Sequence, residues 1–377
     1  MKIACVATSR VPSSTANSIQ VMKVAHALAQ NGHQVRLFVP GNPRESDQKP
    51  SWEHLAAHYG LNTPFEIRWL PSQPAWKRYD FAWKAVRAAR AMRAEVVYTW
   101  TAQAGLMALW HGMPALLEVH DRFTGRLGPL VFRLFRRWPG KKRVLVITQA
   151  LRERLEQQAG PFREGELIIA PNGADVARYA ELPEPCAARR QLGLKETFTA
   201  VYSGHFYPGR GMDVLLGLAL RFPQAQFLWV GGRPEDVEGW RERLAGAGLS
   251  NVSLTGFVEN RGLPLYQAAA EVLLMPYEQV IAGSSGGNSA EICSPMKMFD
   301  YLAAGRAIIS SDLPVIHEVL NERNAVFCPP ADTQAWQEAF AALMQDAARR
   351  EALSAQAKAD AERYKWTIRE EKALRNF

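Results

Sequence analysis

Short runs of apolar residues alternate with helical stretches almost from one end of the chain to the other. Continuous apolar runs of this length are typical of strands buried on both faces of a parallel sheet. In the first half of the chain the predicted strands are residues 3–7, 35–39, 96–98, 115–119, 144–147 and 167–170. Apolar residues at 21, 24, 25 and 28 predict a helix between the first two strands, ending at Asn31 and Gly32. This alternation predicts an α/β fold with a doubly wound parallel sheet.

The series pauses at residues 176–196, which are polar and contain Pro183 and Pro185. A second alternating series then begins, with predicted strands at residues 197–201, 227–230, 252–254, 272–275, 307–310 and 325–327. We therefore expect a first domain at residues 1–172, a connection at 173–195 and a second domain from 196 to 355. Two Rossmann-like domains of this kind are expected to face a cleft, with ligands at the carboxyl ends of their strands.

Composition and charge narrow the class of protein. Hydrophobic residues make up 47% and charged residues 22% of the 377 residues, which is typical of globular domains. The formal net charge of +8 favours an anionic partner, which could be a substrate, an acidic membrane surface or nucleic acid. The four cysteines form no CxxC pair, and neither a DxD triplet nor a close His/Asp set predicts a bound metal. We expect no cofactor.

No targeting or membrane-spanning segment is predicted. The longest apolar stretch, residues 104–119, is interrupted by His111, Gly112 and Pro114. We therefore expect a cytoplasmic protein, whose contact with a membrane, if it has one, is peripheral at the inner face.

Small residues precede a predicted short helix in the second half of the chain. Ser294 and Pro295 resemble an N-cap followed by a first-turn proline, and Gly305 marks the helix end. Residues 283–289 are almost all glycine and serine. A small-residue loop before a helix N-terminus attracts phosphate. The alternative is a plain capped helix with a mobile loop.

A second phosphate-type loop, residues 203–213, follows the first strand of the second domain. Arg210 stands between two glycines where a helix is predicted to begin. A guanidinium there can bind a diphosphate through two parallel hydrogen bonds. The alternative is a surface arginine in a turn.

Polar residues also follow two predicted strands of the first domain. Glu118, His120 and Asp121 stand at the end of one strand, where a histidine can be a ligand-binding group or a satisfied polar side chain. Residues 9–18 follow the first strand and include Thr15 and Asn17, whose polar groups suit a sugar or phosphate or a plain helix cap at Asn17 or Ser18. The absence of GxGxxG here argues against a nicotinamide or flavin enzyme.

Together these segments resemble the retaining glycosyltransferases of family 4, which have the GT-B fold. The similar stretches cover nearly the whole chain and are residues 15–21, 118–121, 146–148, 171–175, 204–211, 231–232, 256–258 and 294–305. The resemblance implies transfer of a sugar, with retention of its anomeric configuration, from a nucleotide-diphosphate sugar to a glycan or lipid-linked acceptor. It also implies that the first domain binds the acceptor, that the second binds the nucleotide sugar, and that a last helix, residues 356–377, crosses back onto the first domain.

The resemblance assigns roles to matching residues. Arg210 is expected to hold the donor diphosphate, Asp300 the ribose hydroxyls and the backbone near Val258 the base, while His120 contacts the transferred sugar. The remaining expected donor-site residues are Gly204, Ser294, Pro295, Met296 and Lys297. Thr15, Asn17 and Asp121 are expected on the acceptor side. We expect His120, Arg210 and Lys297 to be catalytic, the two cations by stabilising the departing diphosphate without a covalent intermediate.

The sequence departs from the family pattern at several positions. The family commonly has two glutamates eight positions apart, but here the second is Asp300 and the first is Ile292, with Glu291 beside it. In the loop at residues 204–211, His205 stands where arginine is frequent and Arg210 where lysine is frequent. A nucleotide-sugar-binding relative without transfer activity and a nucleotide-sugar epimerase of the same fold are therefore alternatives. Nucleic-acid binding is disfavoured, because the basic residues are not interleaved with aromatic ones as in common modules.

A basic stretch lies at residues 122–143. Leu127, Leu130, Val131 and Leu134 recur within it at helical spacing, as in helices that lie on a membrane surface. It predicts either contact with an anionic membrane or a solvated basic face over the core.

Overall fold

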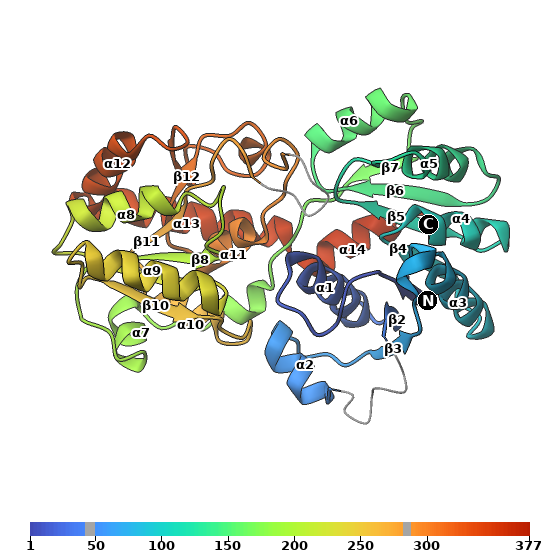
Figure 1. Cartoon of the computed structure of the whole chain (residues 1–377), viewed down its shortest axis with the longest axis horizontal. Helices are drawn as coiled ribbons and strands as arrows, with labels where there is room; N and C mark the ends of the chain where they lie inside the picture. The colour runs from blue at the N-terminus through green and yellow to red at the C-terminus, as the bar shows by residue number, and fades with distance from the viewer. Residues whose placement is uncertain (42–49, 282–287) are drawn as a thin grey trace. The chain divides into compact units, whose positions relative to one another are not determined.

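The computed structural model describes residues 1–41, 50–281 and 288–377. The chain folds into two compact units, shown in Figure 1: unit 1 contains residues 1–172 and 366–377, and unit 2 contains residues 173–365. Each unit has its own parallel sheet and its own hydrophobic core.

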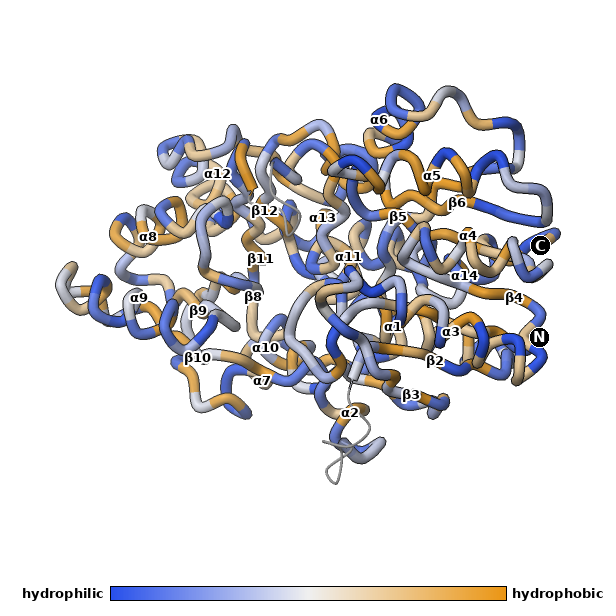
Figure 2. The backbone as a smooth tube through the Cα atoms, turned by 45° about the vertical axis from the view of Figure 1, so that its right-hand side comes forward, coloured by the Kyte–Doolittle hydropathy of each residue, from blue (hydrophilic) through white to orange (hydrophobic). Residues whose placement is uncertain are grey.

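Unit 1 is built on a seven-stranded sheet in the order β3-β2-β1-β4-β5-β6-β7, in which all neighbouring strands are parallel. Its strands are β1 (Lys2–Val6), β2 (Gln34–Pro40), β3 (Glu66–Leu70), β4 (Val96–Thr99), β5 (Ala115–Val119), β6 (Lys142–Val146) and β7 (Leu167–Ile169). Strands β1, β4 and β5 are buried almost throughout, as expected of central strands covered on both faces. The hydropathy colouring of Figure 2 shows β4 and β6 as apolar segments.

Helices cover both faces of this sheet. They are α1 (Ala16–Gln30), α2 (Trp52–Tyr59), α3 (Tyr79–Ala91), α4 (Ala102–Trp110), α5 (Leu127–Arg137), α6 (Gln149–Ala159) and α14 (Trp366–Leu374), with a 3-10 turn at Pro74–Trp76. The strand order reverses between β3 and β4, so right-handed crossovers place α1 and α2 on one face and α3 to α6 on the other. Helix α14 packs against α1 and adds Trp366, Ala373 and Leu374 to the core on that face.

Unit 2 repeats this architecture with a six-stranded parallel sheet in the order β10-β9-β8-β11-β12-β13. Its strands are β8 (Thr199–Gly204), β9 (Gln226–Gly231), β10 (Val252–Gly256), β11 (Val272–Met275), β12 (Ala307–Ser311) and β13 (Val326–Cys328). Its α-helices are α7 (Pro185–Gln191), α8 (Met212–Arg221), α9 (Pro234–Gly246), α10 (Leu263–Ala268), α11 (Met296–Ala304), α12 (Thr333–Gln345) and α13 (Ala347–Ala361). The 3-10 turns are η2 (Val176–Tyr179), η3 (Ile316–Glu318) and η4 (Glu362–Tyr364).

The predicted α/β fold with two parallel sheets is confirmed, and every strand expected from the apolar runs is present. Strand β3 was not predicted, because it lies at the sheet edge and its sequence alternates charged and apolar residues instead of forming a continuous apolar run. Its Glu66 accepts from the Nε atoms of Arg36, at 2.5 Å, and Arg68, at 2.6 Å. Polar pairing of this kind stabilises an edge strand without an apolar signature.

The carboxy-terminal segment differs from the single helix expected at residues 356–377. Helix α13 begins at Ala347 and ends at Ala361, and η4 separates it from α14. Of the segment 356–377, only residues 366–377 belong to unit 1. Residues 173–195, expected as a connection, form η2 and α7 in unit 2, where Ala188 packs against Ala268 and Ala269.

Candidate functional site

The loop after β8 carries Arg210 into a group of tyrosines in unit 2. Gly211, directly after Arg210, has a φ of +68°, and a Cβ atom there would lie 1.7 Å from the carbonyl oxygen of Pro276. Only glycine fits such a position, so this turn is fixed. The Arg210 guanidinium lies 4.7 Å from the ring centroid of Tyr207 and 5.0 Å from that of Tyr277. Its Nη2 also donates to the Tyr207 hydroxyl at 2.5 Å.

Helix α11 brings Lys297 to the same group. The Lys297 Nζ lies 3.9 Å from the ring centroid of Tyr202 and 5.3 Å from that of Tyr277. A Cβ atom at Gly204, the last residue of β8, would lie 2.6 Å from this Nζ, so the strand end passes directly beside the amine. Because Tyr277 contacts both cations, two motifs that are far apart in the sequence form one site.

Arg210 and Lys297 are held by aromatic rings instead of carboxylates. Within residues 1–41, 50–281 and 288–377, neither side chain forms an ion pair with a carboxylate. Burial and the charge of Arg210 lower the pKa of Lys297 well below its usual value. A site that keeps two basic side chains together without a carboxylate partner favours an anionic ligand, whose charge favours the protonated amine, and a guanidinium suits the geometry of a phosphate.

His205 lies beside these cations. Its ring stacks on that of Tyr207 with 5.2 Å between centroids. Burial and the positive charges of Arg210 and Lys297 lower the pKa of His205 below its usual value. His205 is therefore neutral at neutral pH in the free protein and becomes a third cation only if an anion offsets its neighbours.

Helix α11 begins one residue later than the sequence predicts. Its N-cap is Pro295, with φ −65° and ψ 124°, and Met296 is its first helical residue. The prediction of Ser294 as N-cap was wrong, because Pro295 takes the extended conformation of an N-cap instead of the helical one of a first turn. Ser294 is buried directly before the helix. The first turn, which holds Met296 and Lys297, still presents backbone N–H groups and the positive end of the helix dipole.

The remaining expected donor-site residues also lie in unit 2. Asp300 is half-buried on α11. The burial of Tyr179 and, next in size, the charge of Asp300 raise the pKa of Tyr179 above its usual value. Val258 is half-buried in the loop after β10. Ile292 is buried while Glu291 is exposed. The predicted phosphate loop at residues 283–287 lies outside the described residues.

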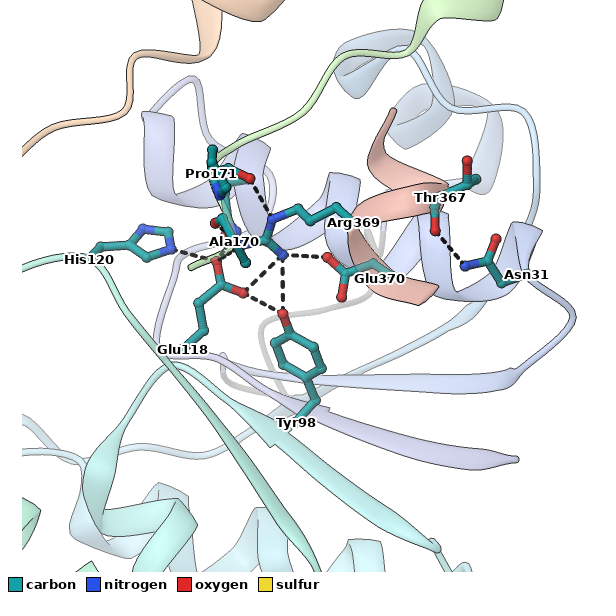
Figure 3. Close-up of polar contacts among 10 residues, drawn as sticks. Asn31, Tyr98, Glu118, His120, Ala170, Pro171, Thr367, Arg369 and Glu370 are labelled. Carbon is teal, nitrogen blue, oxygen red and sulfur yellow. Dashed lines mark hydrogen bonds and ion pairs between the residues drawn. The ribbon is translucent and has the colours of Figure 1, made fainter. Parts of the chain in front are cut away.

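In unit 1, the end of β5 holds Glu118 and His120 on the same side, as residues two apart in an extended chain should be. The Nε2 atom of His120 lies 2.8 Å from Oε1 of Glu118 (Figure 3). The Glu118 side chain is fully buried and that of His120 is 23% exposed. His120 therefore joins a buried carboxylate to the surface of unit 1.

Arg369 of α14 approaches Glu118 from the other side. Its Nη2 donates to Oε1 and its Nη1 lies 3.4 Å from Oε2 of Glu118. Although burial alone would raise it, the pKa of Glu118 is lowered to about 2, because the charge of Arg369 and the hydrogen bond from His120 outweigh burial. Glu118 is thus ionised at all ordinary pH values and accepts hydrogen bonds only.

The expected acceptor-side residues also lie in unit 1 and are exposed or half-buried. Thr15 occupies the N-cap position of α1 and its hydroxyl accepts from Ser13 at 3.2 Å. Asn17 is an exposed residue in the first turn, so the suggested cap at Asn17 or Ser18 was wrong. Ser18 is instead buried and donates to the carbonyl oxygen of Arg10. Asp121 accepts from the backbone N–H of Arg122 at 2.7 Å.

The sequence did not predict the residues that contact Arg210, Lys297 and Glu118 in the structure. Tyr202, Tyr207 and Tyr277 surround the cations, and Tyr277 follows the end of β11, a position that could have identified it. Arg369 stands on an ordinary amphipathic helix and has no local signal.

Among the helices of residues 1–41, 50–281 and 288–377, none has the length and apolar character of a membrane span. No group of three or more His, Cys, Asp or Glu side chains is arranged to hold a metal ion in the described parts of the chain.

Comparison with known families assigns both halves of the chain. Residues 18–178 match the model of Glycosyltransferase Family 4, and residues 197–346 match that of the glycosyl transferases group 1. Each half of the chain is therefore similar to a glycosyltransferase family, and the whole chain has the GT-B fold. The two matched regions contain, respectively, the Glu118–His120 pair and the Arg210–Lys297 site.

The proteins that this chain is similar to include enzymes whose names contain a lipid. The phosphatidyl-myo-inositol mannosyltransferase of Mycolicibacterium smegmatis is 26% identical over 377 residues, covering 92% of this chain and 86% of that protein. For the protein of the same name from Mycobacterium tuberculosis H37Rv, the identity is 26% over 282 residues, 72% of this chain. That match spans 63% of the tuberculosis protein, less than two thirds of its length.

Solved structures share the fold. The crystal structure of Anabaena Alr3699/HepE in complex with UDP has a TM-score of 0.75 at 16% identity, and the match covers 100% of this chain and 99% of that one. At this identity the likeness establishes the fold of this chain and no more.

Proposed function

We propose that this protein transfers a sugar from a nucleotide-diphosphate sugar to an acceptor with retention of anomeric configuration. The observation that carries the proposal is the Arg210–Lys297 site, in which two basic side chains share tyrosine rings and neither forms an ion pair with a carboxylate of the described residues. A diphosphate supplies the missing negative charge. Relatives named as mannosyltransferases and a fold shared with a UDP complex support the same ligand class.

The chemistry we propose is stabilisation of the departing diphosphate. Cleavage of the bond between the sugar and the diphosphate leaves an additional negative charge on the diphosphate. Arg210, Lys297 and the first-turn N–H groups of α11 are fixed before the reaction, so they stabilise this charge without reorganisation. We propose that His120 contacts the transferred sugar.

The other contacts that we propose with the nucleotide sugar come from residues around the start of α11, from Asp300 and from Val258. Ser294, Pro295 and Met296 precede or begin α11 beside Lys297, and Gly204 leaves room for the Lys297 amine. We propose that Asp300 accepts hydrogen bonds from the ribose hydroxyls and that the backbone at Val258 contacts the base.

A nucleotide panel tests the donor class. A ligand that binds only the folded protein raises its melting temperature, so UDP, GDP, ADP and their sugar conjugates should separate into one stabilising family and several inert ones. Slow release of free sugar from the stabilising conjugate would then support transfer chemistry. A protein stabilised by none of them, or by a conjugate that it never cleaves, would contradict the proposal.

Asp300→Ala should weaken nucleotide binding through the ribose. Each hydrogen bond to a charged group contributes about 1.5–3 kcal/mol, so a total loss of about 1.5–4 kcal/mol weakens binding roughly 10- to 1000-fold. A dideoxyribose nucleotide should bind equally to both proteins. Equal losses for ribose and dideoxyribose nucleotides would instead assign Asp300 to the support of Tyr179, whose pKa it helps to raise.

We further propose a lipid-linked acceptor at an anionic membrane, reached by the outer face of α3, α4 and α5. Helix α5 exposes Leu127 (51%), Leu130 (50%) and Leu134 (41%) while burying Phe132 and Phe135 beneath them. Exposed leucines next to basic side chains are typical of helices that lie in a membrane interface. The lipid acceptor in the names of the mycobacterial relatives supports this proposal.

Only part of the basic stretch can serve this face. Arg143 is buried and donates to the carbonyl oxygens of Ala373 and Arg375, and Arg136 is tied to Glu166 and to the chain at residues 159–161. The exposed basic residues are Arg122, Arg126, Arg133, Arg137 and Lys141.

Tryptophans extend the apolar face beyond α5. Helix α4 packs between α3 and α5, and the face gains Trp110 (62% exposed) from α4, Trp83 (36%) from α3 and Trp76 (63%) from the turn before α3. Arg87 lies over the Trp83 ring at 6.0 Å. Tryptophan and arginine favour the boundary between lipid headgroups and acyl chains.

A further inference from the structure

Glu118 is the centre of a buried network in unit 1 that joins His120 to the carboxy-terminal helix (Figure 3). Its carboxylate accepts hydrogen bonds from four side chains. These donors are Gln20 of α1 at 2.7 Å, Tyr98 of β4 at 2.5 Å, His120 at 2.8 Å and Arg369 of α14. A carboxylate with this many donors has one orientation only.

Arg369 donates to that carboxylate, and all three of its guanidinium nitrogens have hydrogen-bond partners. Its Nε donates to the carbonyl oxygen of Pro171 at 2.8 Å, and its Nη2 donates to that of Ala170 at 3.1 Å. Its Nη1 contacts the Tyr98 hydroxyl at 3.2 Å and also donates to Glu370. All three guanidinium nitrogens are therefore held, and the fork cannot rotate away from Glu118.

Helix α14 is anchored at both ends, which keeps Arg369 in place. The Nδ2 of Asn31, at the end of α1, donates to the carbonyl oxygen of Thr367 at 2.9 Å. At the other end Arg143 of β6 donates to Ala373 and Arg375, with its guanidinium 5.3 Å from the Phe377 ring centroid. Both anchors lie within unit 1.

The network determines which nitrogen His120 presents. Because Glu118 is ionised and can only accept, Nε2 of His120 must carry a proton, and in the neutral ring Nδ1 is then the acceptor. Nδ1 is then the ring nitrogen that can accept a hydrogen bond from a sugar hydroxyl. Without Glu118 the ring could rotate or exchange tautomers.

We infer that Glu118 and Arg369 are positioning residues for His120, with Arg369 of the carboxy-terminal helix setting the ring and tautomer that meet the transferred sugar. This inference rests on the proposed role of His120. Arg369 acts without touching His120, so its effect must pass through the Glu118 carboxylate.

The tautomer gives a readout that does not depend on activity. In protein labelled with 15N-histidine, the His120 ring signals are assigned by their absence in His120→Ala. At a pH where the ring is neutral, the unsubstituted protein should show the Nε2-protonated form, whereas Glu118→Gln and Arg369→Gln should show mixed tautomers. Glu371→Gln, an exposed position on the same helix, is the matched control and should leave the signals unchanged. An Nδ1-protonated ring in the unsubstituted protein, or an unchanged tautomer in both variants, would overturn the inference.

Removing one member of a buried ion pair can unfold a protein, because it leaves the other charge buried and unpaired. Stabilisation by the nucleotide identified in the panel shows which variants remain folded. If Arg369→Gln does not fold, Glu118→Gln decides alone, because it keeps the shape of the side chain and removes only its charge.

Kinetics separate the inference from the proposed function. Arg369→Gln should lower kcat for cleavage of the stabilising nucleotide sugar by roughly 10- to 100-fold and leave KM nearly unchanged, because supporting residues act through the group that they orient. A normal kcat in His120→Ala would remove His120 from the reaction. A reduced kcat in His120→Ala with a normal kcat in Arg369→Gln would reject the positioning role alone.

Discussion

At the scale of single residues, substitution of Arg210 distinguishes a role in donor binding from a role in catalysis. If it only holds the donor, Arg210→Ala should raise KM and leave kcat unchanged; if it stabilises the departing diphosphate, kcat itself must fall. We expect kcat to fall about 10²–10³-fold, as when one preorganised donor is removed, and Lys297→Ala to lose less. Steady-state kinetics over a full range of donor concentration measures this, with the exposed Arg221→Ala as control. Near-normal turnover at saturating donor would remove Arg210 from the catalytic residues.

His205 should make diphosphate binding depend on pH. Its pKa is lowered in the free protein by burial, Arg210 and Lys297, and a bound diphosphate would offset both cations and raise it. A proton is then taken up on binding, so affinity for the stabilising nucleoside diphosphate should increase as pH falls from 7 to 5.5. Titration of the nucleotide itself cancels when His205→Gln is compared with the unsubstituted protein at each pH. A ratio of dissociation constants that is the same at both pH values would contradict this prediction.

At the scale of elements, α14 carries a carboxyl group that should limit stability at high pH. Burial and the charge of Glu118 outweigh Arg369 and raise the pKa of Glu370 to about 7. In the unfolded chain a glutamate titrates near 4.3, so between these values the folded protein binds more protons and its free energy of unfolding falls as pH rises. Glu370→Gln removes this loss and should gain roughly 1–3 kcal/mol relative to the unsubstituted protein between pH 5 and pH 8.

Denaturant unfolding at the two pH values measures that change, with exposed Glu371→Gln as the control. The window is chosen above pH 4.3 because Glu118 acts in the opposite direction: its lowered pKa stabilises the fold above that pH and the contribution is lost toward pH 2. An equal difference between Glu370→Gln and the unsubstituted protein at pH 5 and pH 8 would show that Glu370 does not titrate there.

At the scale of the whole molecule, the formal charge of +8 and the apolar face of α3 to α5 together predict binding to anionic vesicles. Cosedimentation with vesicles of phosphatidylglycerol should decrease steeply with salt and be absent with phosphatidylcholine. Leu130→Glu should weaken binding at least about tenfold, because it removes an apolar anchor and adds a negative charge. Leu220→Glu is the matched control, since Leu220 is 53% and Leu130 50% exposed but Leu220 lies on α8 of unit 2. Equal losses in both variants, or no binding at low salt, would reject this face.

The sequence by itself determined the two parallel sheets, because a strand covered on both faces must be apolar throughout and this signal is local. Edge strand β3 was not predicted, because it has no continuous apolar run and its Glu66 pairs with Arg36 of the neighbouring strand. Arg210 and Lys297 were also found locally, each from small residues before a helix.

Only the tertiary structure showed that these two cations share Tyr277, and that the basic residue Arg143 anchors α14 instead of facing a membrane. The same holds for Arg369, which reaches Glu118 across 251 positions of the sequence. A helix-surface arginine and a buried one have the same local pattern. Which of them meets a carboxylate, and whether that carboxylate titrates near pH 2 or near pH 7, is decided by burial and by neighbours that the chain brings together only on folding.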